Sequence, residues 1–400
     1  MKKILILCSY FDGQSTGSLR MRALSESFLR SGHDVRVFTN YFTGSEHLDY
    51  VYAPQDKAIS IGEHSTGLAV LYRAYRKLKF YCFGIKQHSF YKSFLDTDDG
   101  VYGLANLDAV VVSVPQPEFV DVGVLLSQRY ACPMVVDFRD GLTFEPLSRV
   151  NWLARYFNYR LESSAVINSR AVVSVSDALT DDFMARYPNV SYFVTITNGF
   201  QAPEKKNLEQ SAITDTDFFG PFRDRINILY SGAIERSRLS IFQSLEAFED
   251  AINILTDDLR DRLNILFIGN YSEREITIIN KFGSILPPVS RDDIALAQTQ
   301  ADYLLLFTGP DQSVVTMKIF DYLAARKPII SIGNAPTPAR ILRDSGAGQQ
   351  FRLSRIEDIA LSLSNLKNRQ QRLDTNINEY SIDRLMDEFS QLVLESIGND

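Results

Sequence analysis

Short, continuous apolar runs alternate with longer amphipathic segments through the first 200 residues. Residues 2–10 (KKILILCSY) have the unbroken hydrophobicity of a strand that is buried on both faces. Residues 19–33 carry apolar side chains at helical spacing, and Gly32 is well placed to end that helix. Residues 34–40 (DVRVFTN) then predict a second strand. This strand–helix–strand order indicates an α/β domain with a parallel sheet.

The same alternation continues to about residue 200 and begins again near residue 226. Between the two blocks, residues 201–224 are polar and irregular, which predicts a linker. We therefore expect an α/β protein of two Rossmann-like, doubly wound domains facing a cleft. The domains are expected at 1–200 and 225–378, with a C-terminal helix at 379–400 that can cross back to the first domain. Further strands are predicted at 107–115, 133–140, 171–176 and 192–200, and then at 226–233, 263–270, 301–309 and 327–333.

Composition excludes several classes of protein. The chain has 400 residues, 45% hydrophobic and 23% charged, as in ordinary globular proteins. A net charge of −7 argues against nucleic acid as a partner, because sequence-independent binding of a phosphate backbone needs an excess of basic residues. Three scattered cysteines and four histidines without ligand spacing predict neither disulfides nor a metal cofactor. The N-terminal apolar run is too short for a signal peptide, and no run approaches the roughly 20 residues of a membrane span, so a cytoplasmic protein is expected.

A Gly- and Ser-rich loop follows the first strand and opens a helix, where free N–H groups favour anions. The G-x-G-x-x-G fingerprint is absent, and the second strand ends without an acidic residue, which argues against NAD or FAD. Gly17 and Ser18 are either part of a plain turn or part of a donor-binding loop.

Polar residues also gather where later strands of the first block end. Asp137, Arg139 and Asp140 follow an apolar strand in VVDFRDG, and Asn198 follows another in TITNGF. Because ligands of doubly wound sheets bind at the carboxyl ends of the strands, these residues are candidates to face a sugar or an acceptor. The alternative for the two aspartates and Arg139 is a set of structural ion pairs.

The second block opens with YSGAIERSRLS, which places two arginines just beyond a strand. Gly232, Arg236 and Arg238 lie where a helix is about to begin, and a guanidinium matches the oxygens of a diphosphate. A solvated, charged loop is the alternative.

A lysine and an aspartate stand three residues apart in TMKIFDYLAARKPIIS, residues 316–331. Ser313 or Thr316 could cap the helix that this stretch predicts. Lys318 lies in the first turns, where the helix dipole does not stabilise a cation, which suggests that it meets an anion. Asp321 is one turn further and could accept hydrogen bonds from ribose hydroxyls. An ion pair between Lys318 and Asp321 within the helix is the alternative.

The segment MKIFDYLAARKPII resembles the K-x-F-E-Y-L-A-x-G-K-P-I motif of retaining, GT-B fold glycosyltransferases of family 4. GSLRMRALSESFLRSGHDVRVFT resembles the opening helix and GH-x-V turn of that family. TITNGF resembles its I-x-N-G-x-D segment at the interdomain hinge, and ILYSGAI resembles its I-x-Y-x-G-x-L strand. These motifs follow one another in the family's order over nearly the whole chain, so the resemblance implies the GT-B fold.

The resemblance further implies a function: transfer of a sugar from a nucleotide sugar to a glycan or lipid-linked acceptor in bacterial surface polysaccharide synthesis, with retained configuration and without metal. Asp321 stands in the place of the second carboxylate of the family's E-x7-E pair, which holds the donor ribose. Ser313 replaces the first Glu, and Arg326 stands where the family often has Gly. The implied catalytic groups at the diphosphate are Arg236, Arg238 and Lys318, and the implied donor-binding residues are Gly17, Ser18, Gly232, Ser313, Thr316 and Asp321.

Two other functions stay open. A sugar-nucleotide epimerase of the same architecture would need carboxylates and a histidine in the cleft, and histidines are sparse. A catalytically silent binding or scaffold protein is favoured by the replacement of the first Glu by Ser313.

Residues 68–95 form a basic, aromatic stretch without a single acidic residue. Such a segment suits an anionic membrane surface, and it predicts peripheral attachment to the inner face of the membrane. An ordinary pair of surface helices is the alternative. The candidate membrane-contacting residues are Arg73, Arg76, Lys77 and Lys79.

Overall fold

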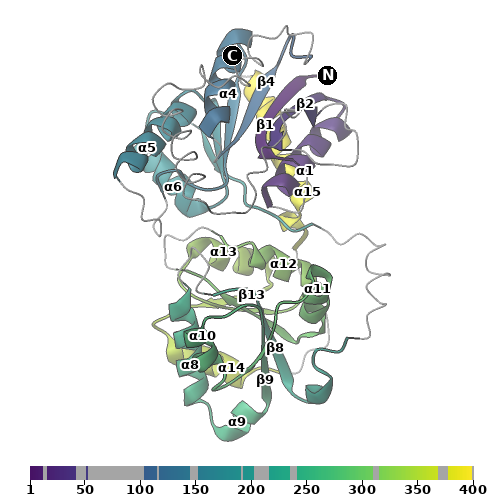
Figure 1. The fold of residues 1–400 in the computed structure, drawn as a ribbon, viewed down its shortest axis with the longest axis vertical. Helices are drawn as coiled ribbons and strands as arrows, with labels where there is room; N and C mark the ends of the chain where they lie inside the picture. The colour runs from purple at the N-terminus through teal and green to yellow at the C-terminus, as the bar shows by residue number, and fades with distance from the viewer. Residues whose placement is uncertain are drawn as a thin grey trace, which may run out of the picture.

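A computed structural model of the protein confirms the predicted fold class, with two parallel β-sheets flanked by helices (Figure 1). Among the described residues, the first sheet has seven strands in the order β3-β2-β1-β4-β5-β6-β7, and the second has six in the order β10-β9-β8-β11-β12-β13. The structure describes residues 1–11, 16–41, 51–52, 103–114, 117–144, 152–190, 192–201, 216–234, 241–309, 315–367 and 377–398.

The strands of the first domain are buried on both faces, as their unbroken hydrophobicity predicts. In β1, Leu5 and Leu7 pack into one hydrophobic cluster, whereas Ile4 and Ile6 pack into another. Successive strand residues point to opposite faces, so each cluster lies on one side of the sheet. The elements are β1 (Lys3–Tyr10), α1 (Thr16–Arg30), β2 (Asp34–Tyr41), β3 (Val51–Tyr52), β4 (Ala109–Val114), α4 (Pro117–Tyr130), β5 (Met134–Phe138), α5 (Trp152–Ile167), β6 (Ala171–Ser174), α6 (Asp177–Arg186) and β7 (Phe193–Thr195).

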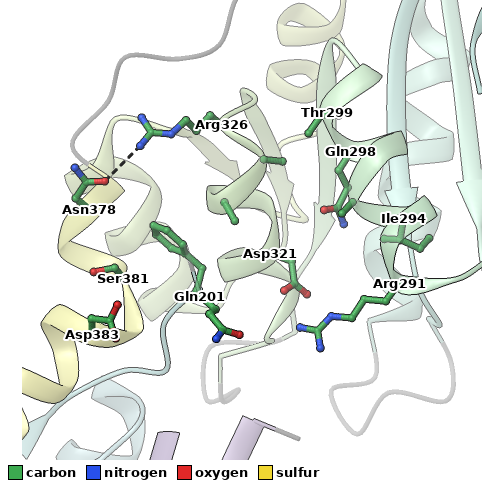
Figure 2. Close-up of a pocket in the computed structure, with 14 residues that line it drawn as sticks. Gln201, Arg291, Ile294, Gln298, Thr299, Asp321, Arg326, Asn378, Ser381 and Asp383 are labelled. Carbon is green, nitrogen blue, oxygen red and sulfur yellow. Dashed lines mark hydrogen bonds between the residues drawn. The ribbon is translucent and has the colours of Figure 1, made fainter. Parts of the chain in front are cut away.

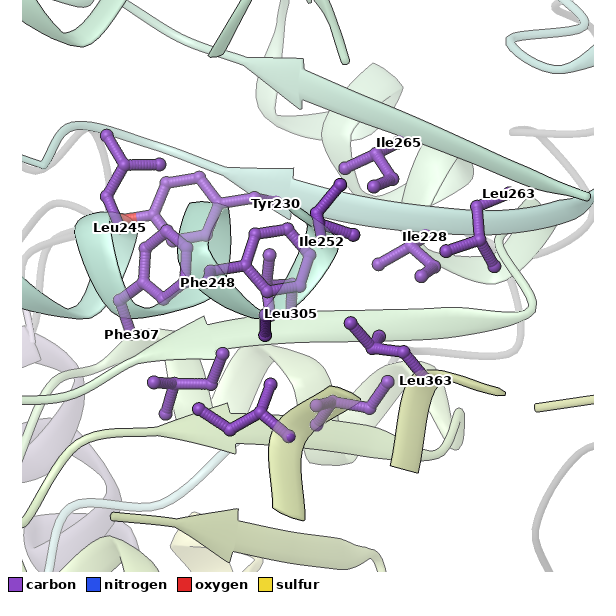
Figure 3. Packing of buried hydrophobic residues seen from close by; sticks show 14 of the residues in the cluster. Ile228, Tyr230, Leu245, Phe248, Ile252, Leu263, Ile265, Leu305, Phe307 and Leu363 are labelled. Atoms are coloured by element: carbon purple, nitrogen blue, oxygen red, sulfur yellow. The ribbon is translucent and has the colours of Figure 1, made fainter. Parts of the chain in front are cut away.

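The second domain repeats this arrangement around a core rich in aromatic side chains. Figure 3 shows one cluster, in which Tyr230, Phe248 and Phe307 pack together beside the central strands. The elements are η3 (Gly220–Phe222), β8 (Ile226–Ser231), α8 (Phe242–Ile254), α9 (Asp257–Asp261), β9 (Leu263–Ile268), α10 (Glu273–Ile279), β10 (Ser284–Leu286), α11 (Arg291–Gln300), β11 (Tyr303–Phe307), α12 (Lys318–Ala325), β12 (Ile329–Ile332), α13 (Pro336–Ser345), β13 (Gly348–Phe351), α14 (Ile356–Ser364), η4 (Ile377–Tyr380) and α15 (Ile382–Gly398).

The chain passes between the domains twice, and the two passages are paired. The Phe200 N–H donates to Tyr380 O at 3.0 Å, and the Ile382 N–H donates to Phe200 O at 2.8 Å. A Cβ on Gly199 would lie 2.7 Å from Tyr380 O, so only glycine permits this approach. Beyond the hinge, α15 returns to the first domain and lies beside α1 (Figure 1).

The domains also meet through side chains of α6 and α13. Arg340 donates to both carboxylate oxygens of Asp177, through Nε at 2.8 Å and Nη2 at 3.1 Å. Thr337 Oγ1 accepts from the Asp177 N–H at 3.3 Å. Because Asp177 begins α6 and Arg340 lies in α13, this pair connects the two domains.

The predicted membrane-contacting stretch, with Arg73, Arg76, Lys77 and Lys79, lies outside the described residues. Across the described ranges, no helix combines the length and the hydropathy needed to cross a bilayer. Cys8 and Cys132 are both free thiols and both buried.

Candidate nucleotide-binding site

Lys318 begins α12 and reaches across to the carboxyl end of β8. Its Nζ donates to Tyr230 Oη at 2.6 Å and to Ala233 O at 3.1 Å, and it lies 4.2 Å from the centre of the Tyr230 ring. The aliphatic stem passes over Gly232, where a Cβ would lie 2.7 Å from Lys318 Cε. Gly232 also has a φ of 106°, so glycine is required there both for the backbone and for the close approach of the lysine.

No carboxylate among the described residues forms an ion pair with Lys318. Burial therefore lowers the pKa of Lys318 from 10.5 to about 7, and the more distant charges of Asp321 and Glu275 compensate only in part. The alternative of an ion pair within the helix is not what the structure shows. A buried amine at a strand end, without an anion beside it, is a place where a phosphate would be stabilised.

Asp321 lies one turn further along α12, and its side chain lines a cavity of about 600 Å³ (Figure 2). Its side chain is accessible because it lines this cavity, yet the surrounding walls displace much of its water. This partial burial raises the pKa of Asp321, whereas the positive charges of Arg291 and Lys318 lower it. The cavity is lined by Phe200, Gln201, Arg291, Ile294, Ala295, Gln298, Thr299, Asp321, Ala324, Ala325, Arg326, Asn378, Ser381 and Asp383.

Three polar side chains hold α11 and α12 against the end of β8. The Tyr322 hydroxyl accepts from the Ser231 N–H at 3.1 Å, and Gln298 Nε2 donates to Ser231 Oγ at 3.2 Å. All three side chains are buried, so this network fixes the helix ends beside the cavity.

Tyr271 adds an unsatisfied group at the same edge of the sheet. Its buried hydroxyl has no hydrogen-bond partner in the part of the chain that the structure describes. A Cβ on Gly269 would lie 3.1 Å from that hydroxyl and 2.8 Å from Gly232 O, so the tyrosine tip lies close to the lysine site. Tyr271, Arg291 and Gln298 were not predicted as site residues from the sequence. Of the three, only Arg291 has a sequence feature that could have indicated a binding role, because it stands at the start of a helix that follows a strand.

Thr316 was predicted as a possible N-cap of α12, but it does not occupy the cap position. Met317 precedes the helix as its N-cap residue, and no side chain of the described residues caps the N-terminus. The Thr316 carbonyl instead accepts from the Ile319 N–H at 3.4 Å. The other proposed cap, Ser313, and the proposed diphosphate ligands Arg236 and Arg238 lie outside the described residues.

Arg326 ends α12 in the left-handed conformation, with a φ of 55°. This backbone favours glycine, which the related motif often has at this position. The guanidinium donates to Asn378 Oδ1 at 3.4 Å and contributes to the cavity wall (Figure 2). The departure from the motif thus places a cation at the far end of the cavity.

In the first domain, Asp137 does not face a ligand, contrary to the expectation. It has no exposed surface, and both carboxylate oxygens accept from Arg20, at 2.9 to 3.2 Å. Arg20 is also fully buried and donates to Ile196 O and Thr197 O. A charge pair buried this completely leaves no oxygen of Asp137 for a sugar, so the structural alternative applies to this residue.

The other predicted residues of the first domain lie at the same edge of the sheet. Arg139 Nε is buried and has no hydrogen-bond partner among the described residues. Its guanidinium lies against Gly17, where a Cβ would be 1.5 Å from Nη1. Asn198 is buried, and its Oδ1 accepts no hydrogen bond from any residue that the structure describes. Asp140 is half-buried, whereas Ser18 is fully buried inside α1. The structure therefore brings Gly17 and Arg139 together.

No cluster of three or more His, Cys, Asp or Glu side chains that could hold a metal occurs among the described residues.

No family model matches the sequence, and no curated protein matches it.

Solved structures do match over the full length of the chain. A UDP-forming α,α-trehalose-phosphate synthase from Burkholderia vietnamiensis superposes with a TM-score of 0.62 at 10% identity, covering 100% of both chains. The lipopolysaccharide outer core galactosyltransferase WaaB superposes with 0.59 at 11% identity, covering 99% of each. A UDP-GlcNAc 2-epimerase from Methanocaldococcus jannaschii reaches 0.50 at 12% identity, covering 99% of this chain and 100% of that one. At such identities the likeness shows the fold alone: two Rossmann-like domains in the GT-B arrangement.

Proposed function

We propose that this protein is a glycosyltransferase that moves a sugar from a nucleotide-sugar donor to a glycan or lipid-linked acceptor in bacterial surface polysaccharide synthesis. The observation that carries the proposal is the placement of Lys318 and Asp321. One helix start presents a buried amine to the end of β8 and a carboxylate to a cavity of about 600 Å³. A nucleoside diphosphate has the complementary groups, namely phosphates for the amine and ribose hydroxyls for the carboxylate.

The amine of Lys318 is suited to stabilise a nucleoside diphosphate as it leaves the sugar. When the bond between the sugar and the β-phosphate breaks, negative charge grows on the phosphate oxygen. Lys318 would stabilise that charge in surroundings with little water, where a positioned cation acts most strongly. Arg236 and Arg238 follow the same strand in the sequence and are proposed to assist. Retention of configuration, without a metal, is part of the proposal and rests on the family resemblance.

Asp321 would hold the ribose, and Arg291 stands beside it on the opposite helix, where the two charges interact (Figure 2). In the first domain, Arg139 and Asn198 each offer a buried polar atom at the carboxyl edge of the sheet, and neither atom has a hydrogen-bond partner within the described ranges. These atoms are proposed to face the transferred sugar or the acceptor.

An epimerase is the second candidate, because an epimerase shares the fold. Incubation with a panel of nucleotide sugars distinguishes the functions. A transferase should transfer or slowly hydrolyse one of them, an epimerase should interconvert two of them, and a silent binding protein should only bind. Lys318→Ala should then lower turnover more than nucleoside affinity, because the charge on the phosphate grows in the transition state. Wild-type turnover in the folded variant would remove the catalytic role.

A further inference from the structure

Helix α5 exposes three large aromatic side chains along one side. Trp152 is 80% exposed, Tyr156 53% and Tyr159 50%. At 3.6 residues per turn, spacings of four and three residues bring them onto the same side of the helix. The chain has a single tryptophan, so its largest aromatic side chain points into solvent.

Two arginines flank this aromatic row, and we call the set of five side chains the α5 ridge. Arg155 and Arg160 are exposed, and all five lie within about 140° of the helix circumference. Neither arginine forms an ion pair with any described residue. The only acidic residue of the helix, Glu162, is fully buried and is held by Arg186 and by the Thr143 hydroxyl. The exposed side chains of the α5 ridge are therefore aromatic and cationic.

The aromatic residues of the ridge do not belong to the hydrophobic core cluster that α5 joins. The opposite side of α5 supplies Leu161 and Ala165 to the hydrophobic core. Figure 1 shows α5 at the outer edge of the first domain, beside α6. Among the described residues, no packing contact accounts for three exposed aromatic side chains, which normally bury most of their surface.

The chemistry of the ridge fits the surface of an anionic lipid bilayer. Tryptophan and tyrosine combine an apolar ring with a polar tip, and they gather where lipid meets water. Arginines beside them attract anionic headgroups. The whole chain carries a net charge of −7 and would be repelled by such a surface, so attachment requires a local patch of this kind.

The size of the ridge favours lipid over a protein partner. Its eight residue steps span about 12 Å at 1.5 Å per residue. A standard protein interface needs roughly 20–30 residues on each side, whereas a few side chains can insert into a bilayer. We propose that the α5 ridge attaches the protein to an anionic membrane surface. This inference is independent of the proposed enzymatic function.

Trp152 fluorescence reports directly on the ridge, because Trp152 is the single tryptophan of the chain. The full-length protein is mixed with vesicles of phosphatidylcholine alone, or of equal parts phosphatidylcholine and phosphatidylglycerol. With the anionic vesicles, the emission should shift to shorter wavelength and the protein should float with the lipid. Both effects should be absent with the neutral vesicles.

Two double variants keep Trp152. One removes the positive charges of the ridge, and the other removes its tyrosine rings. Arg155→Gln with Arg160→Gln should lower the partition coefficient about 30-fold, as expected for two basic residues near an anionic surface. Tyr156→Ser with Tyr159→Ser should lower it as well. Arg352→Gln with Arg355→Gln, two exposed arginines of the second domain, is the matched control and should leave it unchanged.

Several results would overturn the proposal. Flotation without a change in Trp152 emission would assign attachment to another segment, such as residues 68–95. Equal binding to neutral vesicles, or an unchanged partition coefficient in the arginine variant, would remove the electrostatic argument. An emission shift that depends on protein concentration without lipid would make the ridge a contact between copies of the chain. Absence of binding to either vesicle would reject the idea altogether.

Discussion

Replacing Lys318 with methionine should make the free protein more stable and its complex with a nucleoside diphosphate weaker. Methionine keeps most of the stem that passes over Gly232 but carries no charge. The buried amine has no anion within ion-pair distance among the described residues, so its charge destabilises the folded protein until a ligand arrives. A site that is prepared for an anion in this way trades stability for binding.

The size of the stability effect follows from the pKa of Lys318, which burial lowers from 10.5 to about 7. At about 1.4 kcal/mol per pKa unit, the folded state disfavours the charged amine by about 5 kcal/mol. Between pH 7 and pH 10.5 the folded protein binds fewer protons than the unfolded chain, so this group makes stability rise with pH. Its contribution should change by about 2 kcal/mol between pH 7 and pH 9, and Lys318→Met should lack that change.

Calorimetric unfolding of wild type and Lys318→Met at pH 7 and pH 9 tests this. The variant should gain about 2 kcal/mol more, relative to wild type, at pH 7 than at pH 9. The hydrogen bonds to Tyr230 and Ala233 are lost at both pH values and cancel in the comparison. Lys281→Met is the control, because Lys281 is exposed and paired with Glu249 at the surface.

Ligand binding provides the second half of the test. Titration calorimetry with UDP, GDP and ADP should show an affinity lower by about 1–3 kcal/mol in Lys318→Met, as for a lost hydrogen bond to a charged group. Wild-type affinity should fall from pH 7 to pH 9, since the neutral amine must then take up a proton. If the variant is destabilised equally at both pH values and binds nucleotide like wild type, Lys318 is only a structural tie to Tyr230 and Ala233.

Three further predictions concern other parts of the chain. Asp321→Ala should weaken nucleoside diphosphate binding by about 1–3 kcal/mol in titration calorimetry, and unchanged affinity would remove its role at the ribose. Arg326→Gly should raise the free energy of unfolding by about 1 kcal/mol, because its backbone is left-handed, whereas Arg326→Ala should not. Asp137→Ala should destabilise by about 3–5 kcal/mol by leaving Arg20 buried and unpaired. In the same denaturation experiment, Glu246→Ala, which breaks an exposed pair, should cost at most about 1 kcal/mol.

The sequence alone was sufficient for the architecture. Apolar runs such as residues 2–10 and 226–233 are long enough for a strand and too uniformly hydrophobic for an exposed face, so they predict parallel sheets buried on both sides. The order of strands and helices then restricts the chain to doubly wound domains. Lys318 and Asp321 were predicted as site residues for a related reason, because ligands of doubly wound sheets bind where helices start after buried strands. Their role in binding stays a prediction.

Contacts between distant segments were decided only by the tertiary structure. Asp137 was expected to face a sugar or to pair with its neighbour Arg139, but its partner is Arg20, 117 positions away, which α1 carries to the same place. Lys318 and Asp321 are close enough in sequence to pair, yet one turns to β8 and the other to the cavity. The cavity wall combines Phe200 with residues of η4 and α15, which meet only because the chain crosses the hinge twice. Local patterns report which side chains a strand or helix presents, whereas the partner that each one finds depends on long-range packing that no short window of sequence contains.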